Sequence, residues 1–356
     1  MSGRVYLDWN ATAPLRAEAR AAMVAALDVV GNPSSVHAEG RAAKALVERA
    51  REDVAALVGC QPREVVFTSG ATEAARVLAG GPEGHDVYVD ETAHDCLFAH
   101  LRAGGNAAGG HTLALGLANS ETGVISASPE KGADGYPWGA RRADWLMLDI
   151  VQAVGRVPFA FGWSGADLAV VSAHKIGGPK GVGALIVRDG FDIGTLQPGG
   201  GQEMGRRSGT ENVAGIAGFG AAARAALAEQ EAGVWTNVAA RRDRLEARVE
   251  AGAPGTIFVG RELSRLPNTS CLMTPGWKGE TQVMQMDLAG FAISAGSACS
   301  SGKVKTSRVL KAMGFDDVAA ASAVRVSIGP ATTEDELDRF ADAWLGAQAR
   351  FAARAA

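Results

Sequence analysis

Two nucleophilic side chains, the amine of Lys175 and the thiol of Cys299, each lie in a run of small residues. Lys175 belongs to SAHKIGGPKG (172–181), and Cys299 belongs to SAGSACSSG (294–302). A lysine amine with small neighbours can hold an aldehyde cofactor as a Schiff base. A cysteine in a polar loop can ionise and attack an electrophile. Together the two runs predict an enzyme of sulfur chemistry that uses a carbonyl cofactor.

Three more polar residues follow apolar runs. Asp149 ends the run WLMLD (145–149), Gln152 lies three residues later, and His94 follows the run VYV (87–89). Because open α/β sheets bind ligands at the carboxyl ends of parallel strands, Asp149 and Gln152 are predicted to face a cavity. A solvated aspartate at a strand end is an equally simple explanation. The spacing of the histidines matches no metal-binding pattern, so we predict no metal site.

Two segments rich in glycine and hydroxyl residues also have the composition of binding loops. The turn SGAT (69–72) precedes a predicted helix, whose first N–H groups could bind phosphate. An ordinary capped helix with Glu73 in its first turn explains the same residues. The run GGGQEMGRRSGTEN (199–212) has many functional side chains, which favours a working loop over a passive connection.

The elements around these residues predict an α/β fold. Leu46, Ala50 and Val54 recur at helical spacing within 41–58, and Gly59 is a suitable helix end. Apolar runs at 64–68, 87–89, 113–115, 145–148, 168–171 and 183–187 are typical of buried, mostly parallel strands. We expect a large α/β domain over residues 14–233. Residues 1–13 and 234–356 are expected to form a smaller α+β domain that contains the Cys299 loop.

The bulk properties exclude several classes of protein. The 356 residues include 35 Lys+Arg and 39 Asp+Glu, and a net charge of −4 gives no footprint for nucleic acid. The four cysteines are far apart, which indicates a reducing compartment and no disulfide framework. The sequence contains no signal-like core and no apolar stretch of bilayer length. We therefore expect a soluble cytoplasmic protein that binds neither nucleic acid nor membrane.

The motifs, taken in order, resemble those of the cysteine desulfurases of the class V aminotransferase family. These are pyridoxal-phosphate (PLP) enzymes of fold type I. The resemblance extends nearly end to end, through YLDWNATAP (6–14), GNPSSVH (31–37), TSGATE (68–73), SAHK (172–175), the 199–212 run, SAGSACSS (294–301) and RVSIG (325–329). It implies a PLP-dependent transferase with a large parallel-sheet domain, a smaller α+β domain and a homodimeric assembly.

The resemblance implies a role for each matching residue. Lys175 would bind PLP and later move protons, Asp149 would pair with the pyridine nitrogen, and His94 would stack on the ring. Gln152 would contact the ring oxygen. The phosphate would be held by Ala71, Thr72, Ser172 and His174, with Thr210 reaching in from a second subunit. Substrate would meet Asn10, Asn119, Ser120 and Arg325, of which Arg325 would clamp the carboxylate. Cys299 would take the sulfur of L-cysteine as a persulfide and release alanine.

The implied function is therefore L-cysteine desulfurase, supplying sulfur to an acceptor or scaffold protein for iron–sulfur cluster assembly. Two alternatives stay open: a selenocysteine lyase or other PLP lyase on the same scaffold, and a non-catalytic sulfur-transfer scaffold. Three departures from the family pattern concern the periphery. Ser120 replaces a family asparagine, residues 122–144 are rich in Gly, Pro and Ser where a helix is usual, and the chain stops soon after its last predicted helix.

Overall fold

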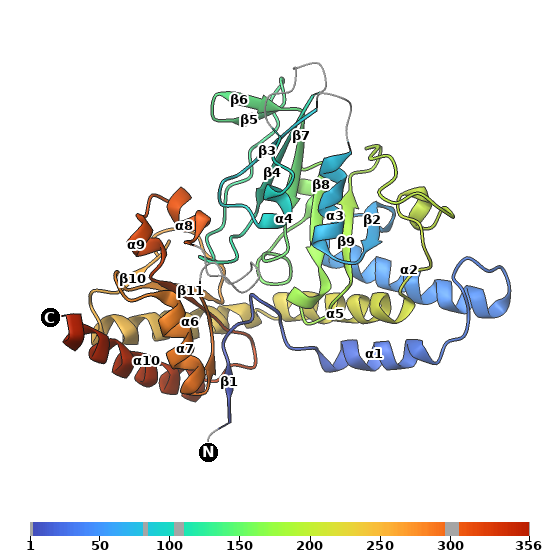
Figure 1. The fold of residues 1–356 in the computed structure, drawn as a ribbon. Helices are drawn as coiled ribbons and strands as arrows, with labels where there is room; N and C mark the ends of the chain where they lie inside the picture. The colour runs from blue at the N-terminus through green and yellow to red at the C-terminus, as the bar shows by residue number, and fades with distance from the viewer. Residues whose placement is uncertain (1–2, 81–84, 103–109, 296–305, 356) are drawn as a thin grey trace. The chain divides into compact units, whose positions relative to one another are not determined.

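The computed structural model describes residues 3–80, 85–102, 110–295 and 306–355. It divides into two compact units (Figure 1). Unit 1 comprises Met1–Thr12, Ala118–Ser126 and Gly233–Ala356, and unit 2 comprises Ala13–Leu117 and Ala127–Ala232. The short segment 118–126 belongs to unit 1 although both of its chain neighbours belong to unit 2, an excursion that no sequence pattern indicated.

Unit 2 is built on a six-stranded sheet in the order β2-β9-β8-β7-β4-β3. The strands are β2 (Val65–Thr68), β3 (Asp86–Val89), β4 (His111–Gly116), β7 (Trp145–Asp149), β8 (Leu168–Ser172) and β9 (Gly183–Val187). Strands β3, β4, β7 and β8 pair in parallel, whereas β9 pairs antiparallel with both β8 and β2. The predicted α/β class and mostly parallel sheet are confirmed, and the one reversed strand makes the sheet mixed.

Both faces of this sheet are buried, which explains the continuous apolar runs in its strands. On β8, Ala169 and Val171 belong to one core cluster, while Leu168 and Val170 belong to another. Helix α5 (Val213–Glu231) packs against both α1 (Ala17–Leu27) and α2 (Ala38–Val58), and all three contribute to the first cluster. The second cluster is covered by α3 (Ala71–Ala74), η2 (Ala75–Ala79) and α4 (Asp95–Phe98).

Helix α2 shows how local sequence sets the ends of an element. It begins three residues before the predicted start, because the His37 side chain caps it by accepting from the Gly40 N–H. It ends at Gly59, which adopts φ 70°, a left-handed conformation that favours glycine. A Cβ at Gly59 would also lie only 2.8 Å from the Ala160 Cα, so packing requires glycine there as well.

The segment before the Asp149 strand forms a hairpin. Strands β5 (Tyr136–Trp138) and β6 (Arg141–Ala143) pair antiparallel within the segment 122–144, which the sequence analysis singled out as a departure from the usual helix of the family. The hydroxyl of the buried Tyr136 donates to the Gly165 carbonyl at 2.6 Å, which connects the hairpin to the rest of unit 2. Short 3-10 turns complete the unit: η1 (Pro62–Glu64), η4 (Phe161–Trp163), η5 (Ala173–Lys175) and η6 (Glu203–Gly205).

Unit 1 is an α+β unit with its own core. Its main sheet has the order β10-β11-β14-β13 and is antiparallel, formed by Ile257–Phe258, Thr269–Met273, Ala323–Ser327 and Ser294–Ala295. Strand β1 (Val5–Tyr6) pairs in parallel with β12 (Phe291–Ala292). The helices are α6 (Val234–Gly252), α7 (Gly279–Leu288), α8 (Arg308–Ala312), α9 (Asp317–Ala320) and α10 (Glu334–Ala355). The core combines aliphatic and aromatic side chains, with Trp344 and Phe340 fully buried.

None of the helices in the described residues has both the length and the apolar character needed to span a membrane.

Candidate active site

Three predicted site residues of unit 2 follow the carboxyl ends of parallel strands. His94 lies after β3, Asp149 is the last residue of β7, and Lys175 ends the turn η5 that follows β8. Strands β7 and β8 are neighbours, with Asp149 paired to Val170 in register. The parallel order of the sheet therefore brings these three chain segments to one edge, as expected of a ligand site in an open α/β sheet.

His94 and Asp149 lie close together, with Cys96 beside them. Ligand-type atoms of these three side chains all lie within 4.8 Å of one another. His94 caps α4 by accepting the Cys96 N–H at Nδ1, at 3.1 Å, which fixes the ring's orientation. The Cys96 Sγ lies 4.0 Å from an Asp149 oxygen. The sequence analysis did not place Cys96 in the site. The sequence pointed to it only by its position two residues after His94.

Asp149 is a buried carboxylate in a largely apolar setting. Burial raises the pKa of Asp149, and His94, the Val151 N–H and the Lys175 ammonium act in the opposite direction. The Val151 N–H donates to one carboxylate oxygen at 2.9 Å. Among the residues that the structure describes, no arginine forms an ion pair with Asp149. A buried carboxylate without a guanidinium partner favours a ligand that has a positive charge of its own.

The opposite charge gathers around His174, the neighbour of Lys175. Burial first, and then the positive charges of Lys175, Lys180 and Arg156, lower the pKa of His174 to about 4. His174 is therefore neutral at pH 7 in a region of positive potential. Ser172, the last residue of β8, is buried two residues before it. A neutral imidazole, a hydroxyl and several nearby cations are suited to an anionic group such as a phosphate.

Gln152 has a fixed orientation because of Arg156, which lies four residues later. The buried Arg156 donates from Nη1 to the Gln152 Oε1 at 2.7 Å and from Nη2 to the Lys175 carbonyl at 3.1 Å. The amide oxygen of Gln152 thus faces Arg156. Arg156 joins Gln152 to Lys175, a link that their spacing in the sequence gave no reason to expect.

A pocket of about 770 Å³ opens beside these residues in unit 2. Thr72 and His94, both predicted site residues, line it, together with Ser69, Glu73, Arg76, Asp95, Cys96, Ala99, His100, Gln197 and Arg207. The turn before α3 approaches strand β9 closely, since a Cβ at Gly183 would lie 2.7 Å from the Gly70 Cα. This contact fixes the backbone that leads into Ala71 and Thr72, the residues predicted to hold phosphate.

The loop that contains Thr210 is anchored at a buried ion pair. Glu203 accepts from two Arg51 nitrogens at 2.8 Å each, and from the Phe67 N–H at 2.8 Å. Glu203 and Met204 adopt positive φ angles of 48° and 59°, the left-handed region that these residue types enter rarely. Thr210 itself is exposed to solvent. The loop is therefore held on unit 2 at Glu203, with Thr210 presented outward.

In unit 1, Arg325 of β14 is buried and already paired. Its Nη2 donates to an Asp8 oxygen at 2.6 Å, and its Nη1 donates to the Ser120 carbonyl at 2.9 Å. The Nε is buried and has no hydrogen-bond partner among the described residues. A buried donor without an acceptor is costly, by about 1–3 kcal/mol, so this guanidinium is short of acceptors as it stands.

The predicted substrate residues Asn10, Asn119 and Ser120 also lie in unit 1. Asn10 is buried and donates its amide to the Thr269 Oγ1 at 2.9 Å and to the Ser120 carbonyl at 3.2 Å. The Asn119 Oδ1 accepts the N–H groups of Glu121 and Thr122, which closes its own turn. Ser120 contributes its backbone carbonyl to these contacts. A serine in place of the family asparagine leaves both carbonyl contacts intact.

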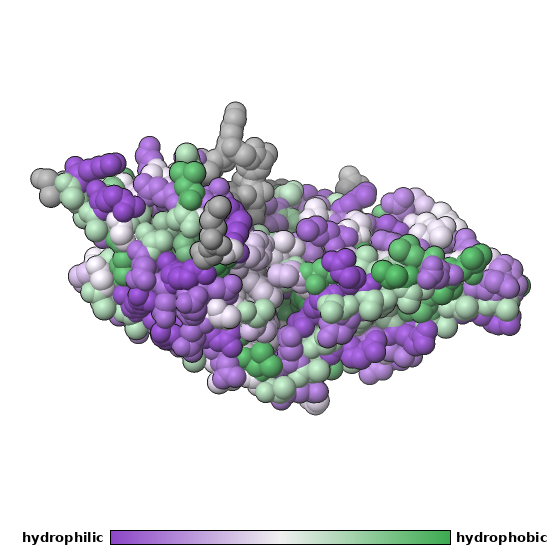
Figure 2. All heavy atoms as spheres, turned by 90° about the horizontal axis from the view of Figure 1, so that it is seen from below, coloured by the Kyte–Doolittle hydropathy of each residue, from purple (hydrophilic) through white to green (hydrophobic). Residues whose placement is uncertain are grey.

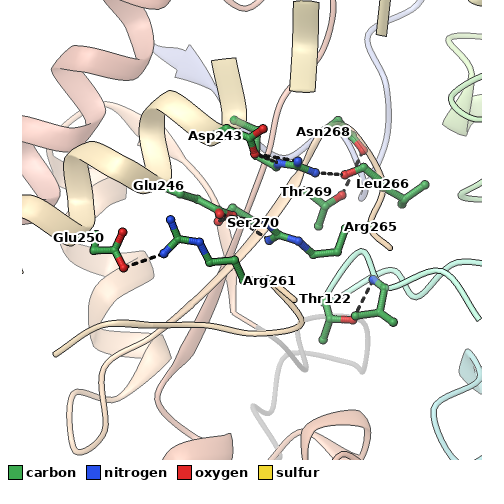
Figure 3. A network of polar contacts seen from close by, with 12 residues as sticks. Thr122, Asp243, Glu246, Glu250, Arg261, Arg265, Leu266, Asn268, Thr269 and Ser270 are labelled. Atoms are coloured by element: carbon green, nitrogen blue, oxygen red, sulfur yellow. Dashed lines mark hydrogen bonds and ion pairs between the residues drawn. The ribbon is translucent and has the colours of Figure 1, made fainter. Parts of the chain in front are cut away.

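A buried polar network next to these residues holds the 264–270 segment in place (Figure 3). Glu246 of α6 accepts from Arg265 at 2.8 and 3.0 Å and from the Ser270 hydroxyl at 2.7 Å, and all three side chains come from unit 1 (Figure 3). The neighbouring Thr269 packs against the segment 118–126, where a Cβ at Gly123 would lie 2.8 Å from the Thr269 Cβ. Thr269 therefore contacts the segment that includes Ser120, whereas the Glu246 carboxylate accepts from Arg265 and Ser270.

Cys299 lies outside the described residues. The three cysteines that are described have unreactive settings, with Cys96 and Cys271 buried and Cys60 half-buried. Burial raises the pKa of the Cys60 and Cys271 thiols to about 12 and also raises the pKa of Cys96. A thiol with a raised pKa is a poor nucleophile near neutral pH, so none of these three is a suitable attacking group.

Comparison with known proteins gives a consistent result. The family model described as "Aminotransferase class-V" matches residues 5–101 and 111–340. The chain is 39% identical to a cysteine desulfurase of Cereibacter sphaeroides over 94% of this chain and 93% of that protein. It is 41% identical to a cysteine desulfurase of Frankia sp. (strain EuIK1), over 95% and 90%.

A solved structure agrees with the sequence relatives. The NifS-like protein from Rickettsia africae is similar to this structure with a TM-score of 0.82 and 27% identity, covering 96% of this chain and 98% of that chain. Both the sequence match and the structural match therefore span nearly the whole chain. This chain belongs to the class V aminotransferase family.

Proposed function

We propose that the protein is a PLP-dependent L-cysteine desulfurase, which converts L-cysteine to L-alanine and retains the sulfur as a persulfide on Cys299. The observation that supports this most is the convergence of Lys175, Asp149 and His94 at one edge of the sheet. The sequence relatives bear the name cysteine desulfurase, which favours this activity over the selenocysteine lyase and the inert scaffold.

The residues present fit the cofactor of this family. PLP has a pyridine nitrogen that becomes positive when protonated, an aldehyde and a phosphate; when bound, it supplies an electron sink for the substrate α-carbon. The buried negative charge of Asp149 suits the pyridine nitrogen, and the amine of Lys175 suits the aldehyde. The neutral His174 and the cations around it suit the phosphate, together with Ala71, Thr72 and Ser172.

Within this proposal each side chain of unit 2 has a task. Lys175 would hold the aldehyde group and later move a proton at the substrate α-carbon. Asp149 would keep the pyridine nitrogen protonated. The exposed ring of His94, fixed at Nδ1 by the Cys96 N–H, would contact the cofactor ring and could move a proton. Gln152, with its oxygen held by Arg156, would donate to the ring oxygen through its NH₂ group.

Sulfur transfer is assigned to Cys299. The Cys299 thiolate attacks the sulfur of the substrate, and the Cβ–S bond of the substrate breaks. The bonding electron pair stays on Cβ, which takes up a proton, and the three-carbon product leaves as L-alanine. A persulfide remains on Cys299. The raised thiol pKa values of Cys60, Cys96 and Cys271 support this choice, because they argue against the other three cysteines.

Unit 1 is proposed to recognise the substrate carboxylate through Arg325. Its buried Nε lacks an acceptor within the described part of the chain, and a carboxylate is the acceptor that a guanidinium binds best. In this proposal Asn10 and Asn119 act indirectly. They hold the turn whose Ser120 carbonyl contacts Arg325.

We further propose that the enzyme is a cytoplasmic homodimer that passes sulfur to an acceptor protein for iron–sulfur cluster assembly. Thr210, outward on an anchored loop, is assigned to the phosphate of the partner subunit. Large apolar side chains are exposed on and after α1, namely Val24, Leu27, Val30 and Val36, and Figure 2 shows hydrophobic surface in this part of unit 2. Such surface is typical of a protein interface. The free thiols of the described cysteines fit a reducing compartment.

The replacement Cys299→Ser tests the sulfur-transfer step. Serine keeps the shape but is a much poorer nucleophile toward sulfur, so sulfide release from L-cysteine in the presence of a reductant should be abolished. The cofactor absorbance and its change on adding L-cysteine should stay as in the parent protein. Cys271→Ala and Cys60→Ser are the controls and should keep most of the activity. Sulfide release by the Cys299→Ser protein at a near-parental rate would exclude the persulfide mechanism.

A second experiment tests the cofactor attachment. Borohydride reduction of the holoenzyme followed by peptide mapping should place the label on Lys175. Lys180, exposed and five residues later, is the internal control. A label on Lys180 would contradict the assignment.

A further inference from the structure

Asp8 pairs with Arg325, whose buried Nε has no hydrogen-bond partner among the residues that the structure describes. The Asp8 side chain is 16% exposed and the Arg325 side chain is 4% exposed, and one Asp8 oxygen accepts from Arg325 Nη2 at 2.6 Å. A cation this deeply buried needs a counter-charge close by. Asp8 supplies it, although the motif around Asp8 gave the residue no role in the sequence analysis.

The second oxygen of Asp8 is held as well. The Ser294 hydroxyl donates to it at 2.8 Å. Ser294 and Arg325 are cross-strand partners of β13 and β14, so both groups that hold Asp8 come from adjacent positions of one sheet. The backbone of Asp8 bridges to Ser327, two residues after Arg325 on the same strand. Asp8 is therefore fixed at its main chain and at both carboxylate oxygens.

These contacts fix the guanidinium of Arg325 but occupy only some of its N–H donors. Asp8 takes one Nη2 hydrogen and the Ser120 carbonyl takes one Nη1 hydrogen, out of five N–H groups in the side chain. One hydrogen on each Nη nitrogen remains beyond these contacts, as well as the orphaned Nε. Two parallel N–H groups are what an incoming carboxylate needs for a bidentate pair.

We infer that Asp8 is a positioning residue for substrate recognition: with Ser294 behind it, Asp8 holds Arg325 in the orientation that binds the α-carboxylate of an amino acid. The inference rests on the proposed function, in which Arg325 is the carboxylate clamp. Its physical basis is preorganisation, because a guanidinium that is already held loses less freedom when the ligand binds. Asp8 itself does not touch the reacting atoms.

The inference is tested by ligands that differ only in the carboxylate. L-alanine and ethylamine share the amine and the two-carbon unit, but only L-alanine has the α-carboxylate. Each is titrated into the holoenzyme while the cofactor absorbance is followed. In Asp8→Asn, the dissociation constant of L-alanine should rise about tenfold or more, as expected for losing a charge-assisted contact. The dissociation constant of ethylamine should stay within about twofold of the parent value.

Two further variants separate positioning from stability. Ser294→Ala removes only the hydroxyl behind Asp8, so L-alanine binding should weaken by a smaller factor, about threefold. If Asp8→Asn does not fold, Ser294→Ala alone still tests the inference. Glu246→Gln is the matched control, because Glu246–Arg265 is also a buried carboxylate–arginine pair of unit 1 (Figure 3). It should lower the melting temperature and leave the binding of both ligands unchanged.

Unchanged or tighter binding of L-alanine in both Asp8→Asn and Ser294→Ala would overturn the inference, and so would an equal loss for both ligands. These titrations need no turnover. If the variants changed the two dissociation constants as expected but the parent protein released no sulfide from L-cysteine, the proposed function would fail and the role of Asp8 would stand.

Discussion

Asp149 and Glu246 are both buried carboxylates, one in each unit, but their neighbours differ. Glu246 faces Arg265 in a bidentate pair and also accepts from the Ser270 hydroxyl. Asp149 has the Val151 N–H, the Cys96 thiol and the more distant charges of His94 and Lys175. The chain's own residues complete the setting of Glu246, whereas in our proposal a ligand completes the setting of Asp149. This difference separates a structural ion pair from a binding site.

Positive charge is also placed differently in the two units. Arg265 donates to the Glu246 carboxylate of its own unit (Figure 3), and Arg242 donates to the Leu266 carbonyl. Around His174, by comparison, burial lowers the pKa of the imidazole, and the positive charges of Lys175, Lys180 and Arg156 lower it further. The predictions below use substitutions in both settings to test whether the contrast has functional meaning.

The largest effect is expected for Asp149→Asn. Asparagine keeps the shape but removes the charge that we assign to the pyridine nitrogen, so kcat should fall about a thousandfold. The melting temperature of the cofactor-free protein should not fall, because burial already disfavours the charged form of Asp149. Steady-state kinetics and thermal denaturation check the two parts. A fall in kcat of less than tenfold would contradict the proposal that Asp149, unlike Glu246, belongs to a binding site.

Glu246→Gln should give the reverse pattern. Breaking a buried pair leaves the Arg265 charge uncompensated, at a cost of about 3 kcal/mol in the free energy of unfolding. Activity per folded molecule should be unchanged, since no ligand depends on Glu246. Urea denaturation with parallel activity assays measures both. Full stability together with lost activity would place Glu246 in the site and contradict the comparison.

A smaller, pH-dependent effect is expected for His174→Gln. The pKa of His174 is lowered to about 4 in the folded protein from an unfolded value near 6.5, so between these values the unfolded chain binds more protons. The contribution of His174 to stability is present above pH 6.5 and is lost as the pH falls toward 4. Glutamine does not titrate, so the loss of stability over this window should be shallower in the variant. Equal pH slopes would show that His174 is not held neutral by its neighbours.

Much of unit 2 follows from local sequence. The strands ending at Asp149 and Ser172, the helical turn after Gly70 and the helix end at Gly59 are confirmed, because each depends on residues within one turn or strand. The direction of β9 could not be inferred, since its apolar run is the same in either direction and its pairing with β2 is a contact distant in sequence.

The site was predicted residue by residue, but its supporting contacts were not. Lys175, Asp149 and His94 stand out by type and by position after a strand. Arg156 and Cys96 act by touching those residues, and Asp8 by touching Arg325, in each case through side-chain geometry that no spacing rule fixes. The hairpin of β5 and β6 was likewise hidden, as its short strands lack a long alternating pattern.

The most direct test of the account is to measure both products of one reaction. The holoenzyme is incubated with L-cysteine and an excess of a reductant that cleaves persulfides, and sulfide and L-alanine are quantified together. The account predicts equal amounts of the two, because each turnover breaks one Cβ–S bond and returns the carbon skeleton as alanine. Sulfide accompanied by pyruvate in place of alanine, or neither product, would contradict it.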